Sequence, residues 1–209
     1  MRGKSLPAGI GALAFGILTF VAFLVASPPG GDYKVSDIVD YVARGHRAAV
    51  FVSVYLVVLS SIGLVLLVAR LRSAIGDGAR ASIFWALGIA AAAAWAAGYA
   101  IVVAVPAAFA FSGGHTVTLT NGVIYTFSEA GFAVMSGAGG VILGAALITF
   151  AIGPVAAPSW VRWSTLVAGV AGLAALAWFP FFLVYIWAIL VGVWLIVTDR
   201  APAPVAQTA

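Results

Sequence analysis

The chain has 209 residues, of which 64% are hydrophobic and 8% are charged, and its formal net charge is +4. Soluble domains carry roughly 25% charged residues, so this composition excludes a single soluble core. The basic residues form no clustered face for nucleic acid, and the absence of cysteine excludes disulfides, thiolate metal sites and iron–sulfur clusters.

Long apolar runs alternate with short polar connections along the whole chain. About 20 apolar residues, at 1.5 Å each, cross the ~30 Å hydrocarbon core of a bilayer as a helix. We therefore predict one all-α domain over residues 1–200, a polytopic helical bundle of the cell inner (plasma) membrane with the lipid bilayer as its surroundings. The runs without Asp, Glu, Lys, Arg or His are 10–26, 48–69, 83–111, 131–152 and 165–198.

The first run predicts a span over about 8–26. It follows Arg2 and Lys4 but is longer than the apolar region of a signal peptide, so we expect it to be retained. After it, Ser36 is a good helix N-cap and Asp37 favours a helix start. A short interfacial helix over about 36–46 is expected to lead into the second span.

The second, third and fourth spans are predicted over about 48–69, 83–111 and 130–152. Between the last two lies an alternating β-branched strip over 115–120, followed by the turn pair Asn121-Gly122. This connection is expected to be an extended segment or a hairpin lid.

The block 164–198 decides the number of spans. As one helix its apolar run would be about 51 Å long, and Pro180 lies in its middle, where proline breaks a helix. Two helices over 164–178 and 182–198 give six spans; a single kinked helix gives five. With six spans both termini lie on the more basic, cytoplasmic side. The tail 201–209 is expected to be disordered.

Small residues recur every four positions in the fourth span at Ser136, Gly140 and Gly144. Such ridges let helix backbones approach closely in membranes. The ridge predicts tight packing within the bundle or a seam between two copies of the chain.

Few residues can carry chemistry. Glu129 opens the fourth span and is interpreted as a helix-start residue, as a partner of Arg44 or Arg47, or as a proton or cation site. His46 and His115 fall on the same side of the membrane and could join carboxylates in a metal site, but no H-x-x-x-H or H-E-x-x-H spacing supports one. No cofactor is expected, because the spans contain neither a histidine for haem nor a lysine for retinal.

The order of several short segments carries a resemblance. It is similar to multispan membrane proteins of actinobacteria grouped near the DUF4386 family, for which no activity is established, so the resemblance implies the architecture and no catalysis. The segments are Ser27-Pro28-Pro29-Gly30, 37–47, Ala69-Arg70-Leu71-Arg72, 127–133 and Trp160-Val161-Arg162-Trp163.

These observations favour a non-enzymatic structural subunit that binds a membrane partner or a second copy of itself. The alternative is a transporter or carrier of a small apolar or lipid-like molecule. A third hypothesis is an outward-facing membrane enzyme or metal-binding protein that uses Glu129 and the histidines.

Overall fold

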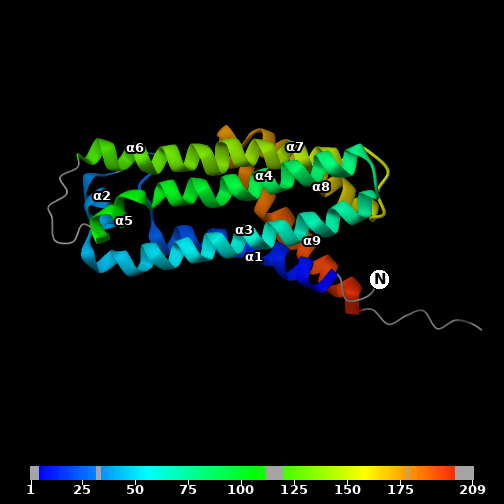
Figure 1. Ribbon diagram of the computed structural model, residues 1–209, viewed down its shortest axis with the longest axis horizontal. Coiled ribbons are helices and arrows are strands. Elements are labelled where there is room, and N and C mark those ends of the chain that lie inside the picture. The colour runs from blue at the N-terminus through cyan, green and yellow to red at the C-terminus, as the bar shows by residue number, and fades with distance from the viewer. Residues whose placement is uncertain (1–4, 32–33, 112–119, 178, 201–209) are drawn as a thin grey trace, which may run out of the picture.

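The computed structural model describes residues 5–31, 34–111, 120–177 and 179–200, and these residues form helices without any strand. The predicted tail 201–209, His115 and the strip before residue 120 lie outside this description. Figure 1 shows an elongated bundle in which α2 lies at one end and both described ends of the chain lie toward the other. We call these the α2 end and the terminal end.

Long helices make up most of the bundle. Their bounds, with those of the shorter elements, are α1 Ser5–Ala26, α2 Val35–Val42, η1 Arg44–His46, α3 Arg47–Ile75, α4 Ala79–Val102, α5 Ala104–Phe111, α6 Asn121–Phe132, η2 Ala133–Ala138, α7 Gly139–Ala151, α8 Ser159–Leu173, η3 Ala175–Ala177, η4 Phe179–Phe181 and α9 Phe182–Arg200.

Four helical stretches are long and apolar enough to cross a membrane, judged by length and composition. They are Ser5–Ala26, Arg47–Ile75, Ala79–Val102 and Asn121–Ala151, the last of which joins α6, η2 and α7. The apolar stretch Phe182–Thr198 of α9 is shorter. Helices suit an apolar surrounding because their backbone hydrogen bonds are satisfied internally.

Glycines set the closest approaches between neighbouring helices. A Cβ placed on Gly11 of α1 would lie 2.6 Å from the carbonyl oxygen of Gly63 in α3. In the same region Thr19 and Ser60 join α1 to α3 through hydroxyl oxygens 2.5 Å apart. Between α4 and the fourth long helix, a Cβ on Gly98 would meet the Gly131 carbonyl at 2.7 Å. Backbone contact of this kind requires residues without side chains.

Three local expectations from the sequence are wrong. The helix predicted over 83–111 is interrupted at Val103, because Pro106 has no N–H for the helical ladder. The pair Asn121-Gly122 is not a turn but the first turn of α6, for which Thr120 is the N-cap and accepts from the Val123 N–H at 3.4 Å. Ser36 is not the N-cap of α2.

Helix α2 begins two residues earlier than an N-cap at Ser36 requires. Its N-cap is Lys34, whose backbone N–H donates to the Asp37 carboxylate at 3.3 Å. The Asp37 side chain, in the first turn of the helix, therefore accepts the hydrogen bond of the N-cap backbone. Its negative charge also interacts favourably with the positive end of the helix dipole. Ile38 and Tyr41 form the buried side of this short helix.

Residues 164–198 form two helices with a turn around Pro180. Trp187 of α9 donates its indole N–H to Thr165 of α8 at 2.9 Å, and the rings of Trp160 and Trp194 lie 6.0 Å apart. These pairings show that α8 and α9 run antiparallel. We call α8, α9 and the described residues between them, 174–177 and 179–181, the short hairpin.

The short hairpin turns back halfway along the bundle, as Figure 1 shows. Phe181 in the turn of the hairpin stacks on Trp95, with ring centroids 5.0 Å apart. Trp95 is the midpoint in sequence between Ala79, where α4 begins, and Phe111, where α5 ends. On the other side, a Cβ on Gly140 would lie 2.6 Å from Ala175. The half of the bundle nearer α2 therefore lacks these two helices.

Candidate functional site

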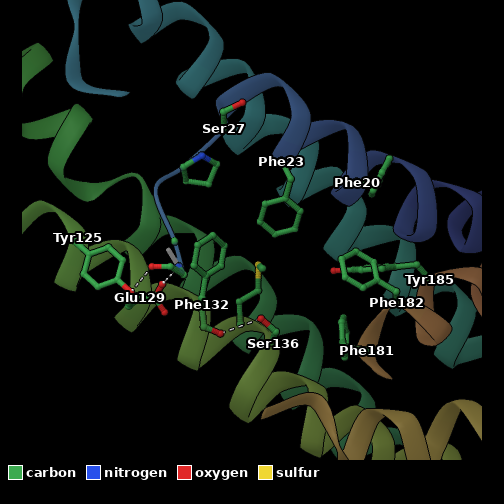
Figure 2. Close-up of a pocket in the computed structure, with 14 residues that line it drawn as sticks. Phe20, Phe23, Ser27, Tyr125, Glu129, Phe132, Ser136, Phe181, Phe182 and Tyr185 are labelled. Atoms are coloured by element: carbon green, nitrogen blue, oxygen red, sulfur yellow. Dashed lines mark hydrogen bonds between the residues drawn. The ribbon is translucent and has the colours of Figure 1, made fainter. Parts of the chain in front are cut away.

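A cavity of about 540 Å³ lies beside the turn of the short hairpin. Helix α1, the α6–η2 segment, η4 and α9 contribute its walls, and the loop 27–31 runs along it (Figure 2). Its lining residues are Phe20, Phe23, Ser27, Pro28, Gly30, Gly31, Tyr125, Glu129, Phe132, Met135, Ser136, Phe181, Phe182 and Tyr185.

The cavity exists because the short hairpin stops where the neighbouring helices continue. Gly140 packs against the hairpin turn, and the 11 residues from Glu129 to Gly140 extend about 16 Å along the helix. Phe181, Phe182 and Tyr185 form the end of the cavity on the hairpin side. Phe20 is 48% exposed and Phe182 is 43% exposed, so the cavity opens sideways between α1 and α9.

Aromatic rings make up half of the lining. The rings of Phe23 and Phe132 lie 5.6 Å apart and tilted, and those of Phe181 and Tyr185 lie 5.1 Å apart and perpendicular. These side chains come from α1, α6, η4 and α9, and Figure 2 shows them around the same space. An apolar space of this size, with few polar groups, is typical of small-molecule sites, which range from about 300 to 1,000 Å³.

The cavity has few polar groups, and they differ in whether a hydrogen bond within the protein already engages them. Glu129 is half-buried, and its Oε1 accepts the backbone N–H of Gly31 at 2.9 Å. Ser136 donates its hydroxyl to the Phe132 carbonyl at 3.1 Å and keeps acceptor capacity. Tyr185 is only 7% exposed, and no described residue forms a hydrogen bond with its hydroxyl. Because Tyr185 lines the cavity, its hydroxyl can form a hydrogen bond with a polar group of a bound molecule.

Helix α6 fastens the loop 27–31 over the cavity with three hydrogen bonds. Ser128 donates its hydroxyl to the Pro29 carbonyl at 2.5 Å, and Tyr125 donates to the Gly31 carbonyl at 3.2 Å. The third is the bond from Gly31 to Glu129. These three side chains lie on one side of a helix because they are spaced by three and four residues. We call this arrangement the loop clamp.

The wall opposite α1 includes a π-helical segment, η2, over Ala133–Ala138. Met135 and Ser136 of this segment line the cavity. A π-helical turn inside an α-helix inserts one residue, shifts the facing of the side chains around it and is frequent at functional sites. The π-helical segment therefore forms part of the wall of the cavity.

The predicted site residues are not gathered into one centre. His46 lies at 2.7 Å from the Ala26 carbonyl through Nε2, so it caps the last turn of α1. It lines a second, smaller cavity of about 280 Å³ together with Asp37, Asp40 and Tyr41. Within the described ranges no group of three or more His, Cys, Asp or Glu could hold a metal ion, and His115 is outside them.

Arg47 does not pair with Glu129. It is the first residue of α3, and its Nε is buried without a hydrogen-bond partner among the described residues. The Glu129 carboxylate bonds the Gly31 N–H instead, and no cationic side chain in the described part of the chain forms an ion pair with it. The side chain of Arg44 lies outside the description.

The ridge of Ser136, Gly140 and Gly144 faces the interior of the chain. A Cβ on Gly144 would lie 2.6 Å from the Gly169 carbonyl of α8, and Gly140 lies against Ala175 and Phe181. Ser136 is 6% exposed. Gly140 and Gly144 therefore pack against the short hairpin and Ser136 faces the cavity, so these three residues offer no free surface to a second copy of the chain.

Sequence reasoning did not single out Tyr185, Phe132 and Phe181. Each sits in a charge-free run where an aromatic residue reads as ordinary packing or as a lipid contact. The two prolines of the Ser27-Pro28-Pro29-Gly30 segment and the Pro180 break were the available signals, since both mark backbone that must find partners elsewhere. Neither signal indicated that the two regions face one cavity.

Comparison of the chain with protein-family models, with curated proteins and with solved structures finds no match. The resemblance to the proteins near the DUF4386 family stays a prediction.

Proposed function

We propose that the protein is a multi-pass protein of the inner membrane with both termini in the cytoplasm. Its four long helical stretches cross the membrane, and the two helices of the short hairpin enter it from the cytoplasmic side without reaching the other surface. The charges at the two ends of the bundle support this. Arg47 and Arg70 lie 23 residues apart on α3, which is about 35 Å of helix and matches the hydrocarbon core with its edges. Arg70, Arg72, Arg80 and Arg162 all belong to the terminal end, as the positive-inside rule expects of the cytoplasmic side.

Within that setting we propose that the protein binds a small lipid-like molecule as a carrier or receptor. The observation that carries the proposal is the aromatic cavity of about 540 Å³ between α1 and α9. In the proposed orientation the short hairpin crosses the inner part of the membrane and turns before the outer surface. The cavity above it then opens toward the outer leaflet, from which an apolar molecule can enter without crossing water.

The geometry favours this function over a structural subunit. The subunit hypothesis relied on small-residue ridges that would meet a partner, but Gly140 and Gly144 contact the short hairpin of the same chain. It also favours binding over catalysis. Glu129 has no described imidazole or second carboxylate in the cavity lining to form an acid–base pair.

Photolabelling in lipid nanodiscs tests the proposal. A neutral long-chain alcohol bearing a diazirine should label peptides that contain Phe20 and Phe182, and excess unlabelled alcohol should compete this labelling away. The exposed side chains Val58 and Ile62 of α3 report ordinary lipid contact. Their labelling should not saturate, because bulk lipid is not a site.

A pair of variants on α1 sharpens the experiment. Phe20→Trp narrows the opening and should reduce saturable labelling several-fold. Ile17→Trp adds similar bulk at a residue that is 45% exposed but does not line the cavity, and it should leave labelling unchanged. Labelling that is equal on α1, α9 and α3, and that excess alcohol does not reduce, would remove the ligand-binding proposal.

A further inference from the structure

We infer that the ligand of this cavity is a lipophilic monovalent cation, such as a long-chain or aryl-substituted ammonium or phosphonium compound. The inference rests on the proposed ligand-binding function and names the chemical class that the site selects. Three features of the lining carry it: one carboxylate, a surrounding set of aromatic faces, and the absence of a described cation that would neutralise the carboxylate.

Glu129 is the single charged residue among the described side chains that line the cavity. Its Oε1 is held by the Gly31 N–H, whereas Oε2 bonds no described group. The loop clamp fixes the carboxylate at the edge of an otherwise apolar space. A negative charge next to such a space attracts a cation more strongly than in water, because the effective dielectric constant is lower.

Aromatic side chains are the second element of the site. Five phenylalanines and two tyrosines line the cavity. The negative face of an aromatic ring attracts organic cations, and aromatic cages recognise quaternary ammonium groups in this way. Aliphatic walls would hold a neutral chain equally well but would give a cation no advantage. Phe, Tyr and one carboxylate together therefore distinguish a cation from a neutral or anionic molecule of equal size.

The hydroxyl of Tyr185 is a polar group that a ligand in the cavity can contact. It lies in the inner part of the cavity next to Phe181 and Phe182, and it has no described hydrogen-bond partner. Figure 2 shows Tyr185 on the side of the cavity away from Glu129, with the phenylalanine rings between them. A ligand can thus place its charge near Glu129 and its apolar body toward Tyr185.

Two ions of nearly equal shape and opposite charge test this inference. Tetraphenylphosphonium and tetraphenylborate are measured by equilibrium dialysis against the full chain in non-ionic detergent, with binding to protein-free micelles subtracted. The readout is the selectivity, defined as the dissociation constant of the borate divided by that of the phosphonium. We compare this selectivity between variants, because the different tendencies of the two ions to enter micelles are the same for every variant and drop out of the comparison.

Glu129→Gln should lower the selectivity about tenfold or more, because the amide keeps the hydrogen bond to Gly31 but removes the charge. Asp77→Asn is the matched control. It also replaces a carboxylate by an amide, but Asp77 is exposed in the turn between α3 and α4 and does not line the cavity, so this variant should keep the selectivity of the parent chain.

Each remaining outcome decides the matter. If Glu129→Gln leaves the selectivity unchanged, or if neither ion binds while the neutral alcohol still labels the cavity, the inference is wrong and the proposed lipid-like binding stands. If the alcohol also fails to label the cavity, the proposed function falls and the inference falls with it.

Discussion

The hydroxyl of Tyr41 donates a hydrogen bond of 2.9 Å to the backbone carbonyl of Val102, 61 residues away in sequence. In an uninterrupted helix that carbonyl would accept the N–H of residue 106. This residue is Pro106, which has no N–H. The short helix α2 thus supplies from its buried side the donor that the α4–α5 junction lacks.

Removing this donor should destabilise the protein. Tyr41→Phe leaves a buried carbonyl without a partner, and we expect unfolding in mixed detergent micelles to become easier by about 1–2 kcal/mol. In a Pro106→Ala background the helix regains its own N–H donor. The loss caused by Tyr41→Phe should then shrink, and equal losses in both backgrounds would contradict the pairing of Tyr41 with the proline gap.

Tyr41 also predicts a dependence of stability on alkaline pH. Burial, with a smaller effect of the neighbouring Tyr99, raises the pKa of the Tyr41 phenol well above its ordinary value near 10. The unfolded chain releases this proton at a lower pH than the folded protein. The contribution of the Tyr41 phenol to the free energy of unfolding is therefore complete below about pH 10. It decreases as the pH rises above that value, by up to about 1.4 kcal/mol per pH unit.

The difference in unfolding free energy between the parent chain and Tyr41→Phe, measured from pH 8 to pH 11, isolates this effect. It should be constant up to about pH 10 and decrease above it. A difference that does not vary over the whole range would show that the phenol is not buried as described.

Gly144 should tolerate no side chain. Because a Cβ there would lie 2.6 Å from the backbone of Gly169 and of Leu173, Gly144→Ala should lower stability by about 1–3 kcal/mol and Gly144→Leu by more. Gly137 on the same long helix is the control. A Cβ there would meet Leu176, which is 74% exposed and can move, so Gly137→Ala should be neutral or slightly stabilising in a thermal unfolding assay.

The loop clamp makes a prediction for hydrogen exchange. Glu129→Ala removes the acceptor of the Gly31 N–H, so exchange of that amide should become at least about tenfold faster, equivalent to the roughly 1.4 kcal/mol or more of a bond to a charged group. Glu129→Gln should keep most of the protection, because an amide oxygen also accepts. Unchanged exchange in the alanine variant would show that other contacts hold the loop.

Cysteine labelling in intact cells tests the proposed topology, since the natural chain has no cysteine. Ser36 of α2 and Ser73 of α3 are both exposed and lie near opposite ends of the bundle. A membrane-impermeant thiol reagent should modify Ser36→Cys directly and Ser73→Cys only after permeabilisation. The reverse pattern would invert the orientation, and labelling of both sites in intact cells would argue against a membrane-crossing bundle.

The sequence by itself determined the helical class and the approximate positions of the long helices. A run without charges that is long enough to cross a bilayer must satisfy its backbone hydrogen bonds internally, and a helix does so using neighbours in sequence alone. The break at Pro180 follows from the same local chemistry, because a missing N–H and a ring clash act on adjacent turns.

Only the tertiary structure decided what the polar residues do and where the cavity lies. The Glu129 carboxylate accepts a hydrogen bond from Gly31, 98 positions away in sequence. His46 caps α1, and the Tyr41 hydroxyl supplies the hydrogen-bond donor that Pro106 lacks. No periodicity in the sequence connects these residues. The depth at which the short hairpin turns likewise depends on Gly140, Ala175 and Phe181 meeting Trp95. Such contacts are set by how whole helices pack, and it is this packing that leaves an aromatic space beside a single carboxylate.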